Sequence, residues 1–213
     1  MAVSPAALRH CFCSTVSSRR QHPMARHPAL TKIVRGLVEF CLFQGAWFAC
    51  ILSAAHGQVA WGVLAVLVWV AISWGLSPQR WVDVVLAGQA VLMGLVWDTW
   101  MLRAGWVDYA SPGPVAMWAP VWILALWALF ATLVRGPLSW LHGRPLLAAV
   151  MGAVGGPLSY LAAVRLGAGR FPDTTQSMIV LAAGWAVMTP MLTEMARWLP
   201  TRRQSDKPVA TLQ

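Results

Sequence analysis

The chain has 213 residues, of which 58% are hydrophobic and only 11% carry a charge, far below the roughly 25% of an ordinary soluble domain. Its fourteen tryptophans favour a membrane location, because the indole ring prefers the interface between lipid and water. The net charge of +9 does not indicate a nucleic-acid partner, because most Lys and Arg flank apolar runs and no soluble face carries them.

These apolar runs predict an all-α, polytopic membrane helix bundle. A span needs about 20 apolar residues to cross about 30 Å of hydrocarbon. The runs are continuous rather than alternating, so helices are expected instead of a β-barrel. Six transmembrane helices are predicted, at about 36–55, 59–76, 82–102, 117–134, 145–165 and 177–198.

Both ends of the chain are predicted to be basic tails on the cytoplasmic side. In this orientation thirteen of the sixteen Lys and Arg lie inside, as the positive-inside rule favours. Residues 1–35 lack the apolar core of a signal peptide and are expected to be largely disordered, with a true start at Met24. Residues 200–213 are expected to be disordered as well.

Asp98 is the most informative residue of the sequence, because it lies fifteen residues into the apolar run from Val84 to Leu102. A carboxylate at that depth is costly unless it is paired, hydrated or protonated. Gly94, four residues earlier, lies on the same helical face and allows another helix or a water to approach. Two interpretations stay open, a hydrogen-bonded structural acid and a functional group.

Further polar positions fall in the first and fifth spans. Gln44 and Trp47 share a helical face, which suits either helix packing or the wall of a polar cavity. In the fifth span Ala148, Gly152 and Gly156 form a stripe of small residues, which permits close contact with another helix, a partner protein or a second copy. Pro157 removes one backbone donor and frees the carbonyl of Ala153, so this helix either lines a cavity or only packs.

We expect Asp98 to line a polar pocket together with Tyr160. Both residues lie about fifteen residues from the cytoplasmic end of their spans, which places them at similar depth at about 1.5 Å per residue. Arg165 lies about one turn beyond Tyr160 and is expected to approach the same pocket.

Four segments resemble the DUF2878 family of uncharacterised bacterial inner-membrane proteins. They are FQGAW in the first span, GLVWD in the third, APVWILALWALFATLVRGPLSWL through the fourth, and GAVGGPLSYLAAVRLGA in the fifth. The resemblance covers about residues 36–199 and implies a location in the bacterial inner membrane. Its motif positions in this chain are Gln44, Trp47, Asp98, Trp122, Trp127, Gly156, Pro157 and Tyr160. The family gives none of these positions a role.

These features favour a binding or accessory protein of the cell envelope, in contact with membrane lipids and with a small polar pocket around Asp98. The pocket residues are expected to be Asp98, Tyr160, Gln44, Trp47, Trp127 and Arg165. An intramembrane lipid-modifying enzyme is the first alternative, and a small-molecule or ion transporter the second. No paired metal or haem ligands and no familiar catalytic motif are present, so neither metal nor cofactor is expected.

Overall fold

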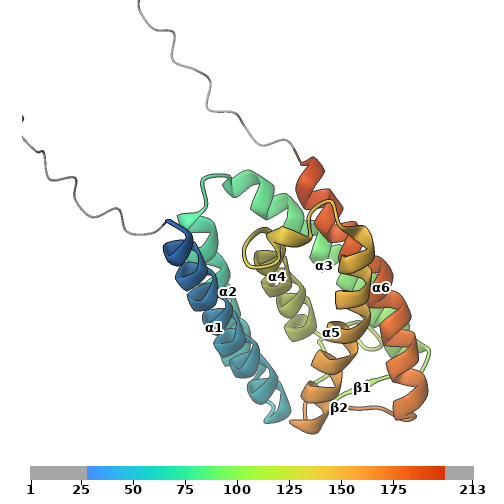
Figure 1. The fold of residues 1–213 in the computed structure, drawn as a ribbon. Helices are drawn as coiled ribbons and strands as arrows, with labels where there is room; N and C mark the ends of the chain where they lie inside the picture. The colour runs from blue at the N-terminus through green and yellow to red at the C-terminus, as the bar shows by residue number, and fades with distance from the viewer. Residues whose placement is uncertain (1–27, 200–213) are drawn as a thin grey trace, which may run out of the picture.

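The computed structural model describes residues 28–199, which form a bundle of six α-helices. Both ends of the described chain lie at the same end of the bundle (Figure 1). The expectations for residues 1–27 and 200–213 lie outside the described residues. The helices are α1 (Pro28–Ala55), α2 (Val59–Leu76), α3 (Arg80–Arg103), α4 (Val121–Arg135), α5 (Pro145–Arg165) and α6 (Thr174–Trp198), with a short 3₁₀ turn, η1 (Ser139–Leu141), after α4.

Five of these helices are long and apolar enough to cross a membrane, and α4 is the shorter one. The predicted fourth span, 117–134, begins too early, because Pro120 precedes α4 in an extended conformation and the helix begins at Val121. With 15 residues α4 is about 22 Å long at 1.5 Å per residue. It lies among the other helices, so protein can cover the irregular backbone at its ends.

The first helix begins earlier than the predicted boundary at residue 36. Helical structure starts at Pro28, which suits the first turn of a helix because its missing N–H has no helical partner there. The apolar part of α1 runs from Ile33 to Ala55. Apart from the start of α1, the predicted spans that correspond to α1, α2, α3, α5 and α6 agree with the observed helices to within a few residues.

Small residues allow the helices to approach one another closely. A Cβ at Gly152 would collide with Thr189 and with the carbonyl of Trp185, both on α6. The stripe of Ala148, Gly152 and Gly156 is buried, and its two glycines pack on α6 of the same chain. In this chain the stripe provides contact between α5 and α6, and oligomerisation through it stays a prediction.

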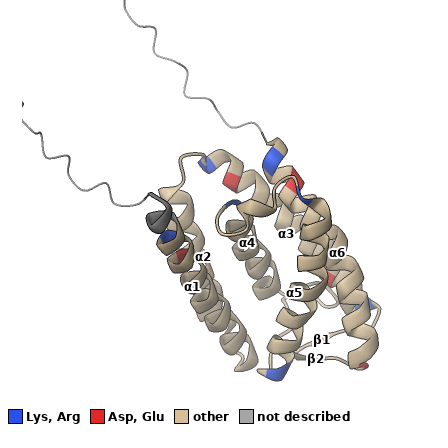
Figure 2. Cartoon of the chain, viewed as in Figure 1, with Lys and Arg blue, Asp and Glu red and all other residues tan. Residues whose placement is uncertain are grey.

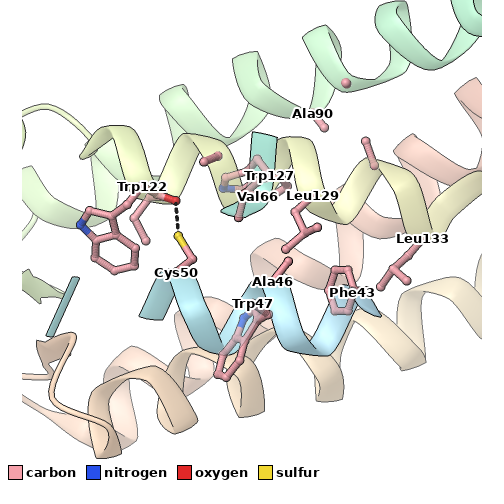
Figure 3. Packing of buried hydrophobic residues seen from close by; sticks show 14 of the residues in the cluster. Phe43, Ala46, Trp47, Cys50, Val66, Ala90, Trp122, Trp127, Leu129 and Leu133 are labelled. Atoms are coloured by element: carbon pink, nitrogen blue, oxygen red, sulfur yellow. Dashed lines mark hydrogen bonds between the residues drawn. The ribbon is translucent and has the colours of Figure 1, made fainter. Parts of the chain in front are cut away.

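The centre of the bundle is formed by α4, which packs against α1, α2, α3 and α6. Leu129 is completely buried, and Cys50 of α1 donates a hydrogen bond to the carbonyl oxygen of Trp122 at 3.6 Å (Figure 3). Both described cysteines, Cys41 and Cys50, are free thiols. Close packing of this kind fixes the relative depth of the helices.

A small antiparallel ribbon closes the end of the bundle opposite residues 28 and 199, the two ends of the described chain (Figure 1). Its strands are β1 (Asp108–Tyr109) and β2 (Gly169–Arg170), with Tyr109 opposite Gly169. A Cβ at Gly169 would come within 2.7 Å of the carbonyl oxygen of Asp108, so glycine permits this close pairing. The ribbon joins the loop before α4 to the loop before α6.

Charged residues lie mostly toward the two ends of the bundle (Figure 2). At the end of the bundle where the described chain begins and ends, Arg135 donates to Asp83 at 2.8 Å, and both side chains are largely buried. At the opposite end Arg170 pairs with Asp108 at 2.8 Å, and both are exposed. Asp98 differs from all of these, because its side chain is completely buried within α3.

Candidate functional site

The carboxyl group of Asp98 accepts three hydrogen bonds from three separate elements. The hydroxyl of Tyr160 on α5 donates to Oδ1 at 2.5 Å, and that of Tyr109 on β1 donates to the same oxygen at 2.6 Å. The indole N–H of Trp127 on α4 donates to Oδ2 at 2.7 Å. We call these four residues the Asp98 cluster. A typical hydrogen bond contributes about 0.5–1.5 kcal/mol net, and these three together join α3, α4, α5 and the ribbon.

Local features of the sequence place each donor. Gly94, one turn before Asp98, has no side chain, and the ring of Trp127 occupies the space that a Cβ would take. The pairing of β1 with β2 positions Tyr109. The sequence interpretation that Gly94 lets a neighbouring helix approach the acid is confirmed, and the neighbour is α4.

Aromatic rings extend the cluster toward α6. Trp185 stacks on Trp127, with ring centroids 4.9 Å apart and planes within 10°. Phe130 and Tyr160 meet the ring of Trp185 edge-on, at centroid distances of 5.2 and 6.4 Å. Gly156 gives Trp185 its space, because a Cβ there would collide with the indole ring. The glycines of α3 and α5 therefore make room for two stacked indoles.

A cavity of about 80 Å³ lies beside the cluster, and we call it the Asp98 cavity. The rings of Tyr109, Tyr160 and Trp127 form part of its wall, whereas Asp98 itself does not line it. Asp98 therefore holds these three side chains in position without itself lining the cavity. The remaining lining is mostly aliphatic and aromatic, with Ser159 as a polar exception.

A larger hollow of about 460 Å³ lies between α1 and α5, and we call it the lateral groove. Its floor includes Phe130 of α4 and Trp185 of α6. Its flanks carry exposed apolar side chains, including Phe48 on α1 and Leu158 on α5. The groove and the Asp98 cavity adjoin, because they share five lining residues: Phe43, Trp47, Phe130, Ser159 and Trp185.

The residues predicted from the sequence fall in three places. Asp98, Tyr160 and Trp127 lie together in the cluster. Gln44 lines the lateral groove, and Trp47 lines both hollows. Arg165 does not join them: its side chain is exposed at the end of α5, and among residues 28–199 it takes part in no ion pair. The three neutral donors occupy the positions around Asp98 that a cation was expected to approach.

Tyr109 belongs to the cluster although the sequence interpretation did not include it. The ribbon that brings Tyr109 back over α3 leaves no periodic signal in the sequence, because its strands have only two residues each. One signal was available, since the chain contains only two tyrosines and both donate to Asp98. Burial raises the pKa of Tyr109 well above its usual range, and the nearby Asp98 raises it further, so the hydroxyl remains a donor.

Within residues 28–199 no group of three His, Cys, Asp or Glu side chains is placed to hold a metal ion. The Asp98 cluster supplies one carboxyl group, two phenols and one indole, a set rich in donors and poor in metal ligands. The chemistry that this arrangement offers is hydrogen bonding and aromatic contact.

Comparison with known proteins gives one family. No curated protein and no solved structure matches the chain. The family model described as "Protein of unknown function (DUF2878)" matches residues 36–191, which include all four residues of the Asp98 cluster and both hollows. The chain belongs to the DUF2878 family.

Proposed function

We propose that the protein is a binding or accessory protein of the bacterial inner membrane, with both termini cytoplasmic, that holds a membrane-dissolved lipid between α1 and α5. The lipid enters the lateral groove sideways from the bilayer and reaches the Asp98 cavity. One observation carries this proposal: an apolar groove with exposed hydrophobic flanks leads to a cavity whose aromatic wall is held by a buried carboxyl group.

The size and lining of the groove support a lipid. Ligand sites usually measure about 300–1,000 Å³ and are mostly apolar with a few polar groups. The groove has about 460 Å³ and carries Gln44, Ser159 and Thr189 among apolar side chains. Its exposed flanks face the direction from which hydrocarbon would reach a membrane-embedded bundle.

The same geometry favours binding over the two alternatives. An intramembrane enzyme would need Asp98 to reach a reacting atom, but the carboxyl group lies behind the rings of its donors. A transporter would need polar groups along a path to both sides, whereas both hollows have mostly apolar linings. Rigid positioning of an aromatic wall suits a site that holds a ligand.

Blocking the junction of the two hollows tests this proposal. Ser159 lines both, so a Ser159→Phe side chain should fill the passage between them. Native mass spectrometry of purified protein should show a lipid retained by the wild type and lost from this variant. Val154→Phe is the matched control, because Val154 is exposed on the same helix and lines neither hollow. Equal lipid retention by wild type, variant and control would contradict the proposal.

A further inference from the structure

A third hollow, of about 330 Å³, lies where α2 and α4 end, at the end of the bundle where the described chain begins and ends. We call it the polar hollow, because its lining differs from the mostly apolar linings of the other two. Two positive and two negative side chains line it, together with three hydroxyl residues: Arg35, Arg135, Glu39, Asp83, Ser73, Ser77 and Thr132. The charged residues of the lining therefore carry no net charge.

The two ion pairs of the polar hollow differ in what they leave free. The terminal nitrogens of Arg135 donate to Asp83 and to the side-chain oxygen of Gln79, at 2.8 and 2.7 Å. Arg35 donates to Glu39 through Nε alone, at 2.7 Å, and the two side chains are 70% and 29% exposed. Within residues 28–199 the terminal nitrogens of Arg35 and Oε2 of Glu39 have no hydrogen-bond partner. This pair therefore offers an accessible cation and an accessible carboxylate oxygen side by side.

The polar hollow adjoins the lateral groove. Leu133 lines both, and on α1 Glu39 lines the hollow while the next residue, Phe40, lines the groove. The groove in turn adjoins the Asp98 cavity. Ile51, which lines that cavity, is twelve residues after Glu39, or about 18 Å along α1. A charged end and a long apolar path thus lie in series, which suits a ligand with a polar headgroup and a hydrocarbon chain.

The aromatic residues place the polar hollow at the level of lipid headgroups. Trp81 near the start of α3, Trp140 after α4 and Trp198 at the end of α6 all lie at this end of the bundle and are exposed. Exposed indole rings favour the interface between lipid and water. A lipid whose chain occupies the lateral groove would therefore have its headgroup beside Arg35 and Glu39.

The charge of the lining restricts that headgroup. A guanidinium group binds a phosphate well, because its N–H groups match the phosphate oxygens. An anionic headgroup at Arg35 would add an unbalanced negative charge close to Glu39, whereas a headgroup that also carries an ammonium group satisfies both side chains. We propose that the protein binds a lipid with a zwitterionic phosphoethanolamine headgroup, with the phosphate at Arg35, the ammonium at Glu39 and an acyl chain in the lateral groove. This inference rests on the proposed function and adds the class of headgroup.

The test compares three lipids with the same acyl chains by competition native mass spectrometry of the purified protein. The probes are dioleoylphosphatidylethanolamine (zwitterionic), dioleoylphosphatidylglycerol (anionic) and dioleoylglycerol (without the phosphate headgroup). Wild type should bind the zwitterionic lipid about fivefold more tightly than either of the others, because partly exposed charge pairs are weak. Glu39→Gln should remove the preference over the anionic lipid. Arg35→Gln should lower the binding of both phospholipids to the level of dioleoylglycerol.

Matched controls exclude effects of charge alone. Glu194 and Arg197 form a partly exposed pair at the same end of the bundle and do not line the polar hollow. Glu194→Gln and Arg197→Gln should therefore leave all three affinities unchanged. Melting temperatures should stay close to wild type in all four variants, since exposed pairs contribute little stability.

Each outcome separates the headgroup from the groove. Equal binding of the two phospholipids by wild type, or an unchanged preference in Glu39→Gln, would overturn the headgroup assignment and leave the lipid-binding proposal standing. Soluble glycerophosphoethanolamine carries the headgroup without acyl chains and should compete only weakly. Competition as strong as that of the intact lipid would overturn the joint use of the hollow and the groove. Failure of all three lipids to bind would contradict both proposals.

Discussion

Replacing Asp98 by leucine should destabilise the protein strongly, because the carboxyl group is the shared acceptor of three buried donors. Asp98→Leu leaves the hydroxyls of Tyr109 and Tyr160 and the N–H of Trp127 without their acceptor. An orphaned buried donor costs about 1–3 kcal/mol, whereas hydrogen bonds measured inside membrane bundles average about 0.6 kcal/mol. Three donors therefore give a range of about 2–9 kcal/mol, and we expect about 4 kcal/mol, since the tyrosines can turn toward the adjoining cavity.

That loss is a large part of a typical total stability of about 5–15 kcal/mol. It corresponds to a fall in melting temperature of about 8–16 °C for a chain of this size. Asp98→Asn should lose less, because the amide oxygen still accepts while its NH₂ group meets at least one donor. Thermal unfolding in detergent, followed by size-exclusion chromatography of the remaining folded fraction, measures both.

Asp108→Asn is the matched control for this series. Asp108 pairs with Arg170 at the exposed end of the bundle, and such pairs contribute about 0–1 kcal/mol. If Asp98→Leu were as stable as wild type, or no less stable than Asp108→Asn, the carboxyl group would not be what holds these elements together.

Four further outcomes follow from the same structure. Gly94→Ala should lower stability by more than about 1 kcal/mol in detergent melts, because its Cβ would collide with Trp127, whereas Gly88→Ala on the same helix meets nothing and should gain up to about 1 kcal/mol. Gly156→Ala should likewise be destabilising through Trp185, with Gly155→Ala as its unobstructed neighbour; equal melting temperatures for the two would contradict the packing. Arg135→Met should cost about 3 kcal/mol by chemical denaturation, because Asp83 then lacks its largely buried partner, against at most about 1 kcal/mol for Arg170→Met at the exposed pair. Burial raises the pKa of Tyr109 in the folded state, so its contribution to stability should be complete below pH 10 and fall as pH rises further. Tyrosinate absorbance should show no ionisation of Tyr109 near pH 10, and comparison with Tyr109→Phe isolates its signal from that of Tyr160.

The apolar helices could be predicted well because membrane spans leave the strongest signal a sequence contains. Continuous apolar runs and flanking basic residues identified α1, α2, α3, α5 and α6 without knowledge of packing. The shorter α4 was predicted too long, because an apolar run does not reveal that Pro120 holds an extended conformation before the helix. The length of an apolar run in the sequence therefore does not give the length of the helix that it forms.

Three of the four residues of the Asp98 cluster were among the predicted pocket residues, and two of them could be found because depth along a helix follows from counting residues. Counting residues placed Asp98 and Tyr160 at the same level, and they lie in hydrogen-bond contact. Counting cannot give rotation about the helix axis, so Arg165 was expected to approach Asp98 although its side chain is exposed. Tyr109 depends on a long-range strand pair, and the stacking of Trp185 on Trp127 depends on the packing of α5 on α6.

Photo-crosslinking with a diazirine-bearing diacylglycerol in bilayers tests the occupancy of the lateral groove most directly. The groove is lined by segments of α1 and α5 that include residues 40–48 and 151–162. We predict that labelled peptides map to these two segments and that unlabelled dioleoylglycerol competes the label away. Ser159→Phe should abolish the label there, and Val154→Phe should retain it. Labelling spread evenly over the lipid-exposed faces of α2 and α5, without competition, would contradict a ligand held between α1 and α5.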